Sequence, residues 1–197
     1  MISWWWVRHG PTHARGMVGW RDLPADLSDQ GALERLNALL PADAALVSSD
    51  LGRAIATADA LTGPDRVRLP HARALREFDF GAWDGLEFAE IAARDPVLSR
   101  QFWENPGDIA APGGESWNDV AARSGAWVDV LNRTPPARHI IAVAHFGTIL
   151  TQLHRALAQT SKQTPYQTLA QRIDNLSVTR LDFDGQRWRV REVNRRA

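Results

Sequence analysis

Three short apolar runs, each ending in polar residues and each followed by a stretch with helical spacing, most constrain how this chain can fold. Such runs are typical of strands buried on both faces of a sheet, and the helical stretches can connect parallel neighbours. The runs lie at 3–7, 44–50 and 139–145, and the helical stretches lie at 28–40, 51–61 and 148–157. This order predicts an α/β fold, a three-layer α/β/α sandwich around a mostly parallel central sheet.

The rest of the sequence is arranged around this repeated unit. Residues 64–115 are largely irregular and are expected to form a cap-like insertion over one end of the sheet, with a short strand at the start of 66–86 and short helices at 87–94 and 97–103. A long helix is predicted at 116–132, and the alternation around Asp184-Gly185 within 177–193 predicts a β-hairpin. The chain has 197 residues without a linker or an internal repeat, so we expect a single domain spanning 1–197.

Composition narrows the classes of function. The formal net charge is zero at pH 7, so nothing global indicates a nucleic-acid or membrane partner. The chain has no cysteine, which excludes disulfides, a thiol nucleophile and a cysteine-based zinc site. No apolar run approaches the roughly 18 residues of a membrane span, and the run before Arg8 is too short for a signal peptide. We therefore expect a cytoplasmic protein.

Cationic and imidazole side chains lie where the predicted strands end. Arg8 and His9 follow the first run, Arg53 lies on the first turn of the helix after the second run, and His145 ends the third. Ligands of open α/β sheets bind outside the carboxyl ends of the strands, so these side chains are expected to gather at one edge. Glu77, in the predicted insertion, is placed to lie over them. Two arginines at one edge favour an anionic ligand, and if that ligand is a phosphoryl group, they stabilise its charge without a metal ion or cofactor.

Five blocks of sequence resemble, in the same order, the motifs of a known family. They are Arg8-His9-Gly10-Pro11-Thr12, Ser48–Ala54, Arg76–Gly85, Pro112–Ser116 and Ala144–Gly147. Together they resemble the histidine phosphatase superfamily, the phosphoglycerate-mutase-like proteins. Within it they are most similar to the small-phosphatase branch of α-ribazole phosphatases and broad-specificity phosphatases. The resemblance runs from residue 8 to residue 147 and implies a phosphatase with the α/β fold expected above.

The resemblance also implies a role for each matching residue. His9 would be the nucleophile that forms a phosphohistidine, Glu77 would donate a proton to the leaving oxygen, and the phosphoryl oxygens would be held by Arg8, Arg53 and His145. The chemistry of these groups agrees with such roles. An attacking histidine nitrogen must be neutral, and nearby arginines lower its pKa. A carboxyl group that donates a proton must be protonated, which burial favours and the arginines oppose.

Three further residues are candidates for binding the substrate. Thr12 would support the loop that carries the nucleophile, and Trp20 could form a wall of the pocket. Arg15 stands where the pattern of the mutases usually has asparagine, so the family's role does not carry over to it. An arginine at this position could contact the phosphate, recognise a second anionic group or point to solvent.

The expected reaction is hydrolysis of a small phosphorylated metabolite, whose identity the sequence does not give. Three alternatives stay open: a phosphoglycerate mutase, a protein phosphatase acting on phosphohistidine or phosphotyrosine, and a phosphate-binding module without catalysis. The short stretch between Arg53 and Glu77 argues against the larger insertion of the mutases. The strand pair at 177–193 could form the edge of a homodimer.

Overall fold

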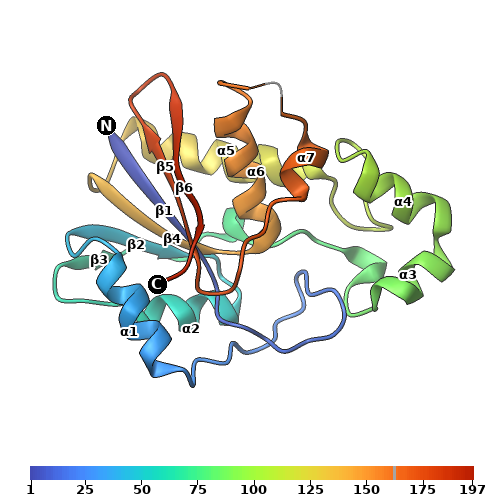
Figure 1. Cartoon of the computed structure of the whole chain (residues 1–197), viewed down its shortest axis with the longest axis horizontal. Helices are drawn as coiled ribbons and strands as arrows, with labels where there is room; N and C mark the ends of the chain where they lie inside the picture. The colour runs from blue at the N-terminus through green and yellow to red at the C-terminus, as the bar shows by residue number, and fades with distance from the viewer. Residues whose placement is uncertain (162) are drawn as a thin grey trace.

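The computed structural model describes residues 1–161 and 163–197, and a six-stranded sheet lies at its centre. The strand order is β3-β2-β4-β1-β5-β6 (Figure 1). The strands are β1 (Ile2–Arg8), β2 (Ala44–Ser48), β3 (Arg66–Arg68), β4 (His139–Ala144), β5 (Val178–Phe183) and β6 (Trp188–Arg195). The first four pair in parallel, whereas β5 and β6 join the sheet as an antiparallel hairpin. The mostly parallel sheet predicted from the sequence is confirmed.

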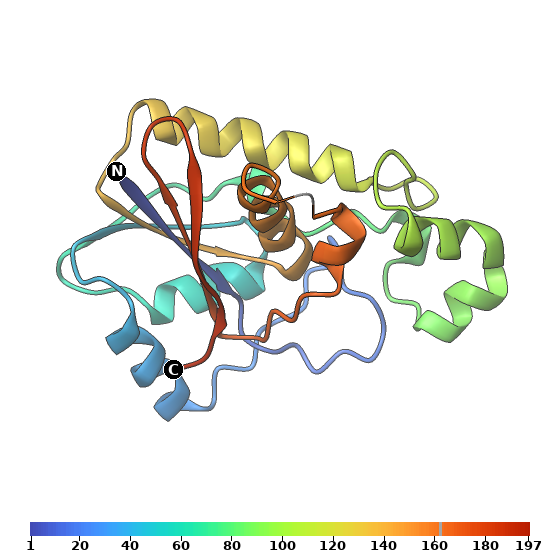
Figure 2. The same ribbon diagram turned by 45° about the horizontal axis from the view of Figure 1, so that its top comes forward.

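Helices cover both faces of this sheet. They are α1 (Gln30–Leu39), α2 (Gly52–Ala60), α5 (Trp117–Arg133) and α6 (Phe146–Leu157), and the short α7 (Pro165–Leu169) packs against α6. Because side chains of a strand alternate between faces, Trp4 and Trp6 pack in the core that contains α5 and α6. Trp5 and Val7 pack in the core on the other face, with α1 and α2. Figure 2 shows the three layers, which confirm the predicted sandwich.

After β3 the chain leaves the sheet, and it forms the cap before it reaches α5. The cap contains α3 (Phe88–Arg94) and α4 (Pro96–Glu104), which project beyond the end of the sheet (Figures 1 and 2). The first part of the insertion expected at 64–115 lies in the sheet instead, because β3 pairs in parallel with β2. Two short 3₁₀ turns, at 73–75 and 81–83, then lead the chain from β3 into the cap.

Capping side chains explain where two of the helices begin. The sequence predicts a helix from residue 28, and α1 begins two residues later. Asp29 caps this helix, because its side chain accepts a hydrogen bond from the N–H of Ala32 at 2.9 Å. Ser116 caps α5, and the Asp119 carboxylate accepts a hydrogen bond from the Ser116 N–H. This reciprocal pair fixes the start of the long helix at the predicted position.

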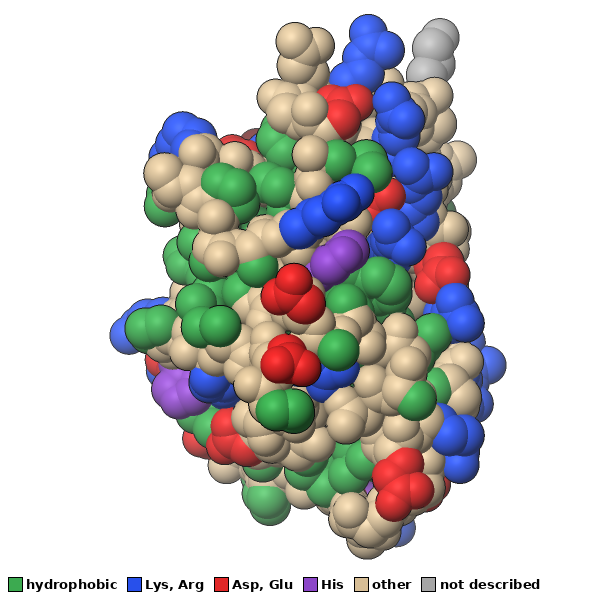
Figure 3. Space-filling model, turned by 90° about the vertical axis from the view of Figure 1, so that its left-hand side faces the viewer, with side chains coloured by type: hydrophobic (Ala, Val, Ile, Leu, Met, Phe, Trp, Pro, Cys, Tyr) green, Lys and Arg blue, Asp and Glu red, His purple; other side chains and the backbone are tan. Residues whose placement is uncertain are grey.

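The face of the molecule turned away from the cap carries both acidic and basic side chains (Figure 3). On the β5–β6 hairpin, Arg180 and Arg191 both pair with Asp182. β6 forms one edge of the sheet, and the homodimer expected at this edge stays a prediction. Within the described residues, none of the helices has the length and apolar character needed to cross a membrane.

Candidate active site

His9 lies directly after β1, and its side chain is buried. Its Nδ1 lies 2.6 Å from the carbonyl oxygen of Gly10. Because a carbonyl can only accept, Nδ1 carries the hydrogen and Nε2 keeps its electron pair. The loop is held by Thr57, which accepts from the Gly10 N–H at 2.9 Å, and by Asn175, which donates to the His9 carbonyl at 2.7 Å. The ring is thus fixed in the tautomer that a nucleophile needs.

Arg53 reaches this ring from the first turn of α2. Its Nε donates to His9 Nε2 at 3.3 Å. Its other two nitrogens donate to the carbonyls of Gly19 and Arg21, at 2.6 and 3.0 Å. The side chain of Arg53 is fully buried. Backbone groups therefore fix a cation beside the atom that would attack phosphorus.

The surroundings of His9 keep it neutral. Burial, reinforced by the cations of Arg53 and Arg8, lowers the pKa of His9 from 6.5 to about 3, although the bond to Gly10 opposes the shift. Burial likewise lowers the pKa of His145 well below its usual range. At neutral pH, Nε2 of His9 therefore offers an electron pair rather than a proton.

Arg8 and His145 complete the cluster. Arg8 Nη1 donates to the Ile173 carbonyl at 2.6 Å, and its Nε has no hydrogen-bond partner in the described part of the chain. His145 follows β4, is fully buried, and its ring centroid lies 5.0 Å from that of His9. Its Nε2 lies 2.6 Å from Ser49 Oγ, while Nδ1 has no partner among residues 1–161 and 163–197. Buried polar atoms normally have partners, so these two nitrogens suit the oxygens of a ligand.

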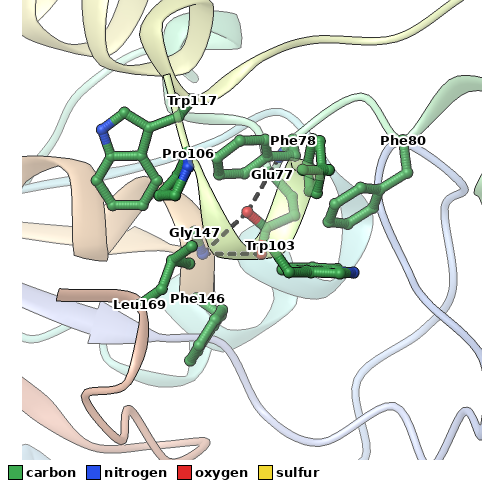
Figure 4. A pocket seen from close by; sticks show the side chains of 10 residues that line it. Glu77, Phe78, Phe80, Trp103, Pro106, Trp117, Phe146, Gly147 and Leu169 are labelled. Atoms are coloured by element: carbon green, nitrogen blue, oxygen red, sulfur yellow. Dashed lines mark hydrogen bonds between the residues drawn. The ribbon is translucent and has the colours of Figure 1, made fainter. Parts of the chain in front are cut away.

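Glu77 lies before the cap, with its carboxyl group buried at the start of α6. Oε1 accepts from the N–H groups of Phe78 and Gly147, both at 3.0 Å. Figure 4 shows aromatic side chains around this carboxyl group, at a small cavity of about 30 Å³. Burial raises the pKa of Glu77, although the two N–H groups, Arg53 and Arg8 oppose the shift. The site therefore favours a protonated carboxyl group, which can act as an acid.

The backbone of Glu77 is held by two side chains that were not predicted for this role. Arg123 of α5 and Trp20 both donate to the Glu77 carbonyl oxygen, each at 2.8 Å. Arg123 also forms two hydrogen bonds with the carboxylate of Glu115, at 2.7 and 2.8 Å. The block at 112–116 was a signal for Glu115, whereas no motif in the sequence singled out Arg123.

A cavity of about 640 Å³ opens between the strand ends and the cap. Arg8, His9 and Glu77 line it, together with Thr12 and Arg15 from the long loop after β1. Arg15 is exposed, and its side chain forms no hydrogen bond or ion pair with the residues that the structure describes. Most of the other lining residues are apolar or aromatic, among them Met17, Val18, Phe80, Phe88, Trp103, Phe146, Tyr166 and Leu169.

Trp20 is placed differently from the pocket wall that the sequence suggested. It is not among the residues that line the cavity. Its ring instead lies against the guanidinium groups of Arg73 and Arg76, whose central carbons are both 4.9 Å from the ring centroid. Because the same ring donates a hydrogen bond to the Glu77 carbonyl oxygen, this packing helps to fix the backbone that carries the acid.

Comparison with known proteins decides which family carries this arrangement. The sequence model of the histidine phosphatase superfamily (branch 1) matches residues 4–196. The chain belongs to this superfamily. A phosphohistidine intermediate is the general mechanism of histidine phosphatases, and the family expected from the five sequence blocks is confirmed.

Several relatives of this chain are phosphatases. It is 33% identical to the glucosyl-3-phosphoglycerate phosphatase of Mycobacterium tuberculosis, over 93% of this chain and 90% of the relative. It is 28% identical to a metal-independent phosphoserine phosphatase of Arabidopsis thaliana, over 92% of this chain and 76% of the relative. It is also 37% identical to a bifunctional protein of Mycobacterium tuberculosis, over 73% of this chain, but the match spans only 41% of that protein.

Solved structures agree with the family and the fold. The mycobacterial glucosyl-3-phosphoglycerate phosphatase in complex with VO3 superposes with a TM-score of 0.82, at 32% identity over 98% of this chain and 99% of that one. The α-ribazole phosphatase of Shigella flexneri gives a TM-score of 0.82 over 100% of this chain and 98% of that one, at 20% identity, which supports the fold alone.

Proposed function

We propose that this histidine phosphatase hydrolyses small phosphomonoesters through a phosphohistidine on His9, with Glu77 as the proton donor. One observation carries the proposal: a neutral, oriented imidazole and a carboxyl group with a raised pKa line the same cavity. A nucleophile and an acid need these opposite protonation states, and the two environments favour each of them. The phosphatases among its relatives support the same reaction.

The proposed reaction has two steps. In the first, the Nε2 electron pair of His9 attacks phosphorus, the bond to the leaving oxygen breaks, and Glu77 gives its proton to that oxygen. In the second, water attacks the phosphohistidine and passes a proton to the Glu77 carboxylate. The phosphorus–nitrogen bond then breaks and phosphate leaves, so both side chains return to their starting states.

Charge stabilisation in both steps is assigned to the groups around His9. Arg8, Arg53 and His145 would bind the phosphoryl oxygens, whose negative charge is spread over three atoms. Fixed cations and donors stabilise such charge without having to reorganise during the reaction. Arg53 now donates to His9 Nε2, and we propose that a bound phosphoryl oxygen takes over this donor when Nε2 attacks.

We infer a small phosphorylated metabolite as the substrate, used in the cytoplasm without a metal ion or cofactor. The names of two relatives state glucosyl-3-phosphoglycerate and phosphoserine as their substrates, and both compounds are phosphomonoesters. Thr12 is proposed to support the nucleophile loop and Arg15 to contact the substrate, since both line the cavity. Residues 1–197 are proposed to act as one domain.

Hydrolysis of p-nitrophenyl phosphate in the presence of EDTA tests this proposal. The wild-type protein should release p-nitrophenol, and His9→Ala should lose this activity because the nucleophile is gone. His71→Ala serves as the matched control, since His71 is exposed and does not line the cavity. Activity that survives in His9→Ala, or that requires a metal ion, would contradict the proposed mechanism.

The alternatives predict different products in the same assay series. A phosphoenzyme that resists water and passes its phosphoryl group to an acceptor would identify a mutase. A preference for a phosphopeptide over small phosphomonoesters would identify a protein phosphatase. Binding of orthovanadate by a folded protein that turns over no phosphomonoester would identify a phosphate-binding module.

A further inference from the structure

The backbone of residues 19–21 holds Arg53 and is itself held by one carboxylate. The carbonyls of Gly19 and Arg21 accept from the Arg53 guanidinium at 2.6 and 3.0 Å. The N–H groups of the same two residues donate to Asp84, from Gly19 to Oδ1 at 3.1 Å and from Arg21 to Oδ2 at 2.9 Å. The segment therefore lies between a carboxylate and a guanidinium, with hydrogen bonds to both.

Further backbone contacts hold the preceding part of the loop to the residues that follow Asp84. The Met17 N–H donates to the Leu86 carbonyl at 2.9 Å, and the Gly85 N–H donates to the Met17 carbonyl at 2.8 Å. Gly16 lies so close to the Gly85 backbone that a side chain on it would overlap the Gly85 carbonyl. The loop is thus held at the point where the chain passes into the cap.

We propose that Asp84 is a positioning residue, which fixes the backbone carbonyls of residues 19–21 and through them the orientation of Arg53 against His9. Asp84 does not line the cavity, and it forms no hydrogen bond with His9 or Arg53 among the described residues. It acts through the backbone, and a charged acceptor makes both of its hydrogen bonds stronger than neutral ones. Its effect on the rate rests on the proposed function, whereas its effect on the position of Arg53 does not.

The first test compares Asp84→Ala with a matched control. Misplacement of Arg53 should lower kcat/KM for p-nitrophenyl phosphate on the order of 10- to 100-fold and weaken the binding of orthovanadate. Asp84→Asn should lose less, because its amide keeps one acceptor oxygen. Asp108→Ala removes an exposed carboxylate that accepts from Asn118, and it should leave both measurements unchanged. Thermal unfolding of each variant checks that it is folded.

A double-mutant cycle separates positioning from a general structural role. If Asp84 acts through Arg53, adding Asp84→Ala to Arg53→Ala should weaken orthovanadate binding no further than Arg53→Ala alone. A structural role would add its own loss in the double variant. Additive losses, or wild-type binding in a folded Asp84→Ala variant, would overturn the proposal.

The NMR titration of His9 keeps this test independent of activity. If the wild-type protein neither hydrolyses phosphomonoesters nor binds orthovanadate, the proposed function fails, but the titration still reports on Arg53. Displacement of the Arg53 cation should raise the pKa of His9 in Asp84→Ala. Removal of the negative charge alone would lower it, so an unchanged or lower pKa rejects the positioning role.

Discussion

Glu77 is a carboxyl group whose surroundings set its protonation state. Burial raises its pKa, whereas the N–H groups of Phe78 and Gly147 and the nearby arginines act in the opposite direction. Because burial outweighs the other effects, the folded protein keeps a proton on Glu77 at pH values where an exposed glutamate has lost it. An acid in this state matters most when the leaving oxygen is a strong base.

We expect Glu77→Gln to discriminate between leaving groups. For an alkyl phosphate such as glycerol 3-phosphate, kcat/KM, which reports the steps up to the phosphohistidine, should fall by a factor of about 100 or more, because the alkoxide needs a proton as it leaves. Activity on p-nitrophenyl phosphate should fall much less, since p-nitrophenolate leaves without one. Steady-state kinetics on both substrates checks this, and equal losses of kcat/KM would show that Glu77 is not the acid.

The pH profile provides a separate test of the same residue. In the wild-type protein, kcat/KM for glycerol 3-phosphate should decline as pH rises through the raised pKa of Glu77, since the acid is then lost. Protonation of His9 should not lower kcat/KM between pH 4 and pH 7, because the pKa of His9 is about 3. A rate that rises with pH across the neutral range would contradict these protonation states.

Arg15 is expected to recognise an anionic group outside the phosphoryl site. It lines the cavity, is exposed and has no partner among the described residues, and most of the wall around it is apolar. Arg15→Gln should lower kcat/KM for 3-phosphoglycerate about tenfold, which corresponds to about 1.4 kcal/mol. Glycerol 3-phosphate lacks the carboxylate and should be unaffected. An equal loss on both substrates would place Arg15 at the phosphoryl group, and no loss would place it in solvent.

At the scale of elements, the start of α6 holds the acid only because residue 147 is glycine. A Cβ there would overlap the Phe78 ring and lie 2.5 Å from Glu77 Oε1. Gly147→Ala should therefore displace the carboxyl group and reduce activity on glycerol 3-phosphate much more than on p-nitrophenyl phosphate. Kinetics on the two substrates tests this displacement.

Gly125→Ala is the matched control for that variant. Gly125 lies inside α5, and the nearest group to an added Cβ is Arg155 Nη1 at 3.6 Å, an ordinary contact. Alanine in a helix interior is favoured over glycine by roughly 1 kcal/mol, so this variant should be slightly more stable and fully active. Equal activity losses in the two variants would reject the specific role of Gly147.

Most of the elements that carry the site could be predicted from sequence, because their signals are local. Apolar runs identified β1, β2 and β4, and helical spacing identified the helices that follow them. The short α7 was not predicted, since its five residues are too few to show a period. A short strand was predicted at the position of β3, but it was placed in the insertion rather than in the sheet, because its pairing with β2 is not visible in a three-residue pattern.

The supporting residues of the site were harder to predict. Arg123 lies in the middle of α5, where the sequence alone indicates only an exposed charge on a helix. In the structure its guanidinium donates to the carbonyl oxygens of Ala74, Arg76 and Glu77. Such a role depends on where a helix packs, which no local pattern records. Asp84 could be found only as a member of the block 76–85, without any indication that it binds residues 19–21.

At the scale of the whole molecule, buried titratable groups should confine stability to a middle range of pH. The folded pKa of His9 lies below its usual value, and that of His145 does too, so the unfolded chain takes up more protons as pH falls below about 6.5. Both histidines therefore contribute stability that is lost in acid. The pKa of Glu77 is raised, so its contribution is lost as pH rises above that of an unfolded glutamate.

We expect the denaturant concentration at the unfolding midpoint to pass through a maximum as pH is varied. Two variants should separate the contribution of the buried histidines from that of Glu77. His9→Gln should lose less stability than the wild type between pH 6.5 and pH 4. Glu77→Gln should lose less stability than the wild type as pH rises above about 4.5, the pKa of an unfolded glutamate. Chemical denaturation measured at pH values on both sides of the maximum tests both predictions, with His71→Ala as the control. Parallel pH profiles for all four proteins would show that these buried groups do not set the dependence.

The position of β1 in the middle of the sheet has a consequence for how the protein is made. Its residue Trp4 pairs with Ile140 on one side and Leu181 on the other, so neither neighbour exists when β1 leaves the ribosome. Contacts between residues so far apart in sequence form late, and the need to form them slows folding. A nascent chain must keep three consecutive tryptophans from aggregating until residues 139–183 have been translated. Under the proposed function, activity would then appear only after β4 and β5 have been synthesised, and chaperone dependence should be greatest before that point.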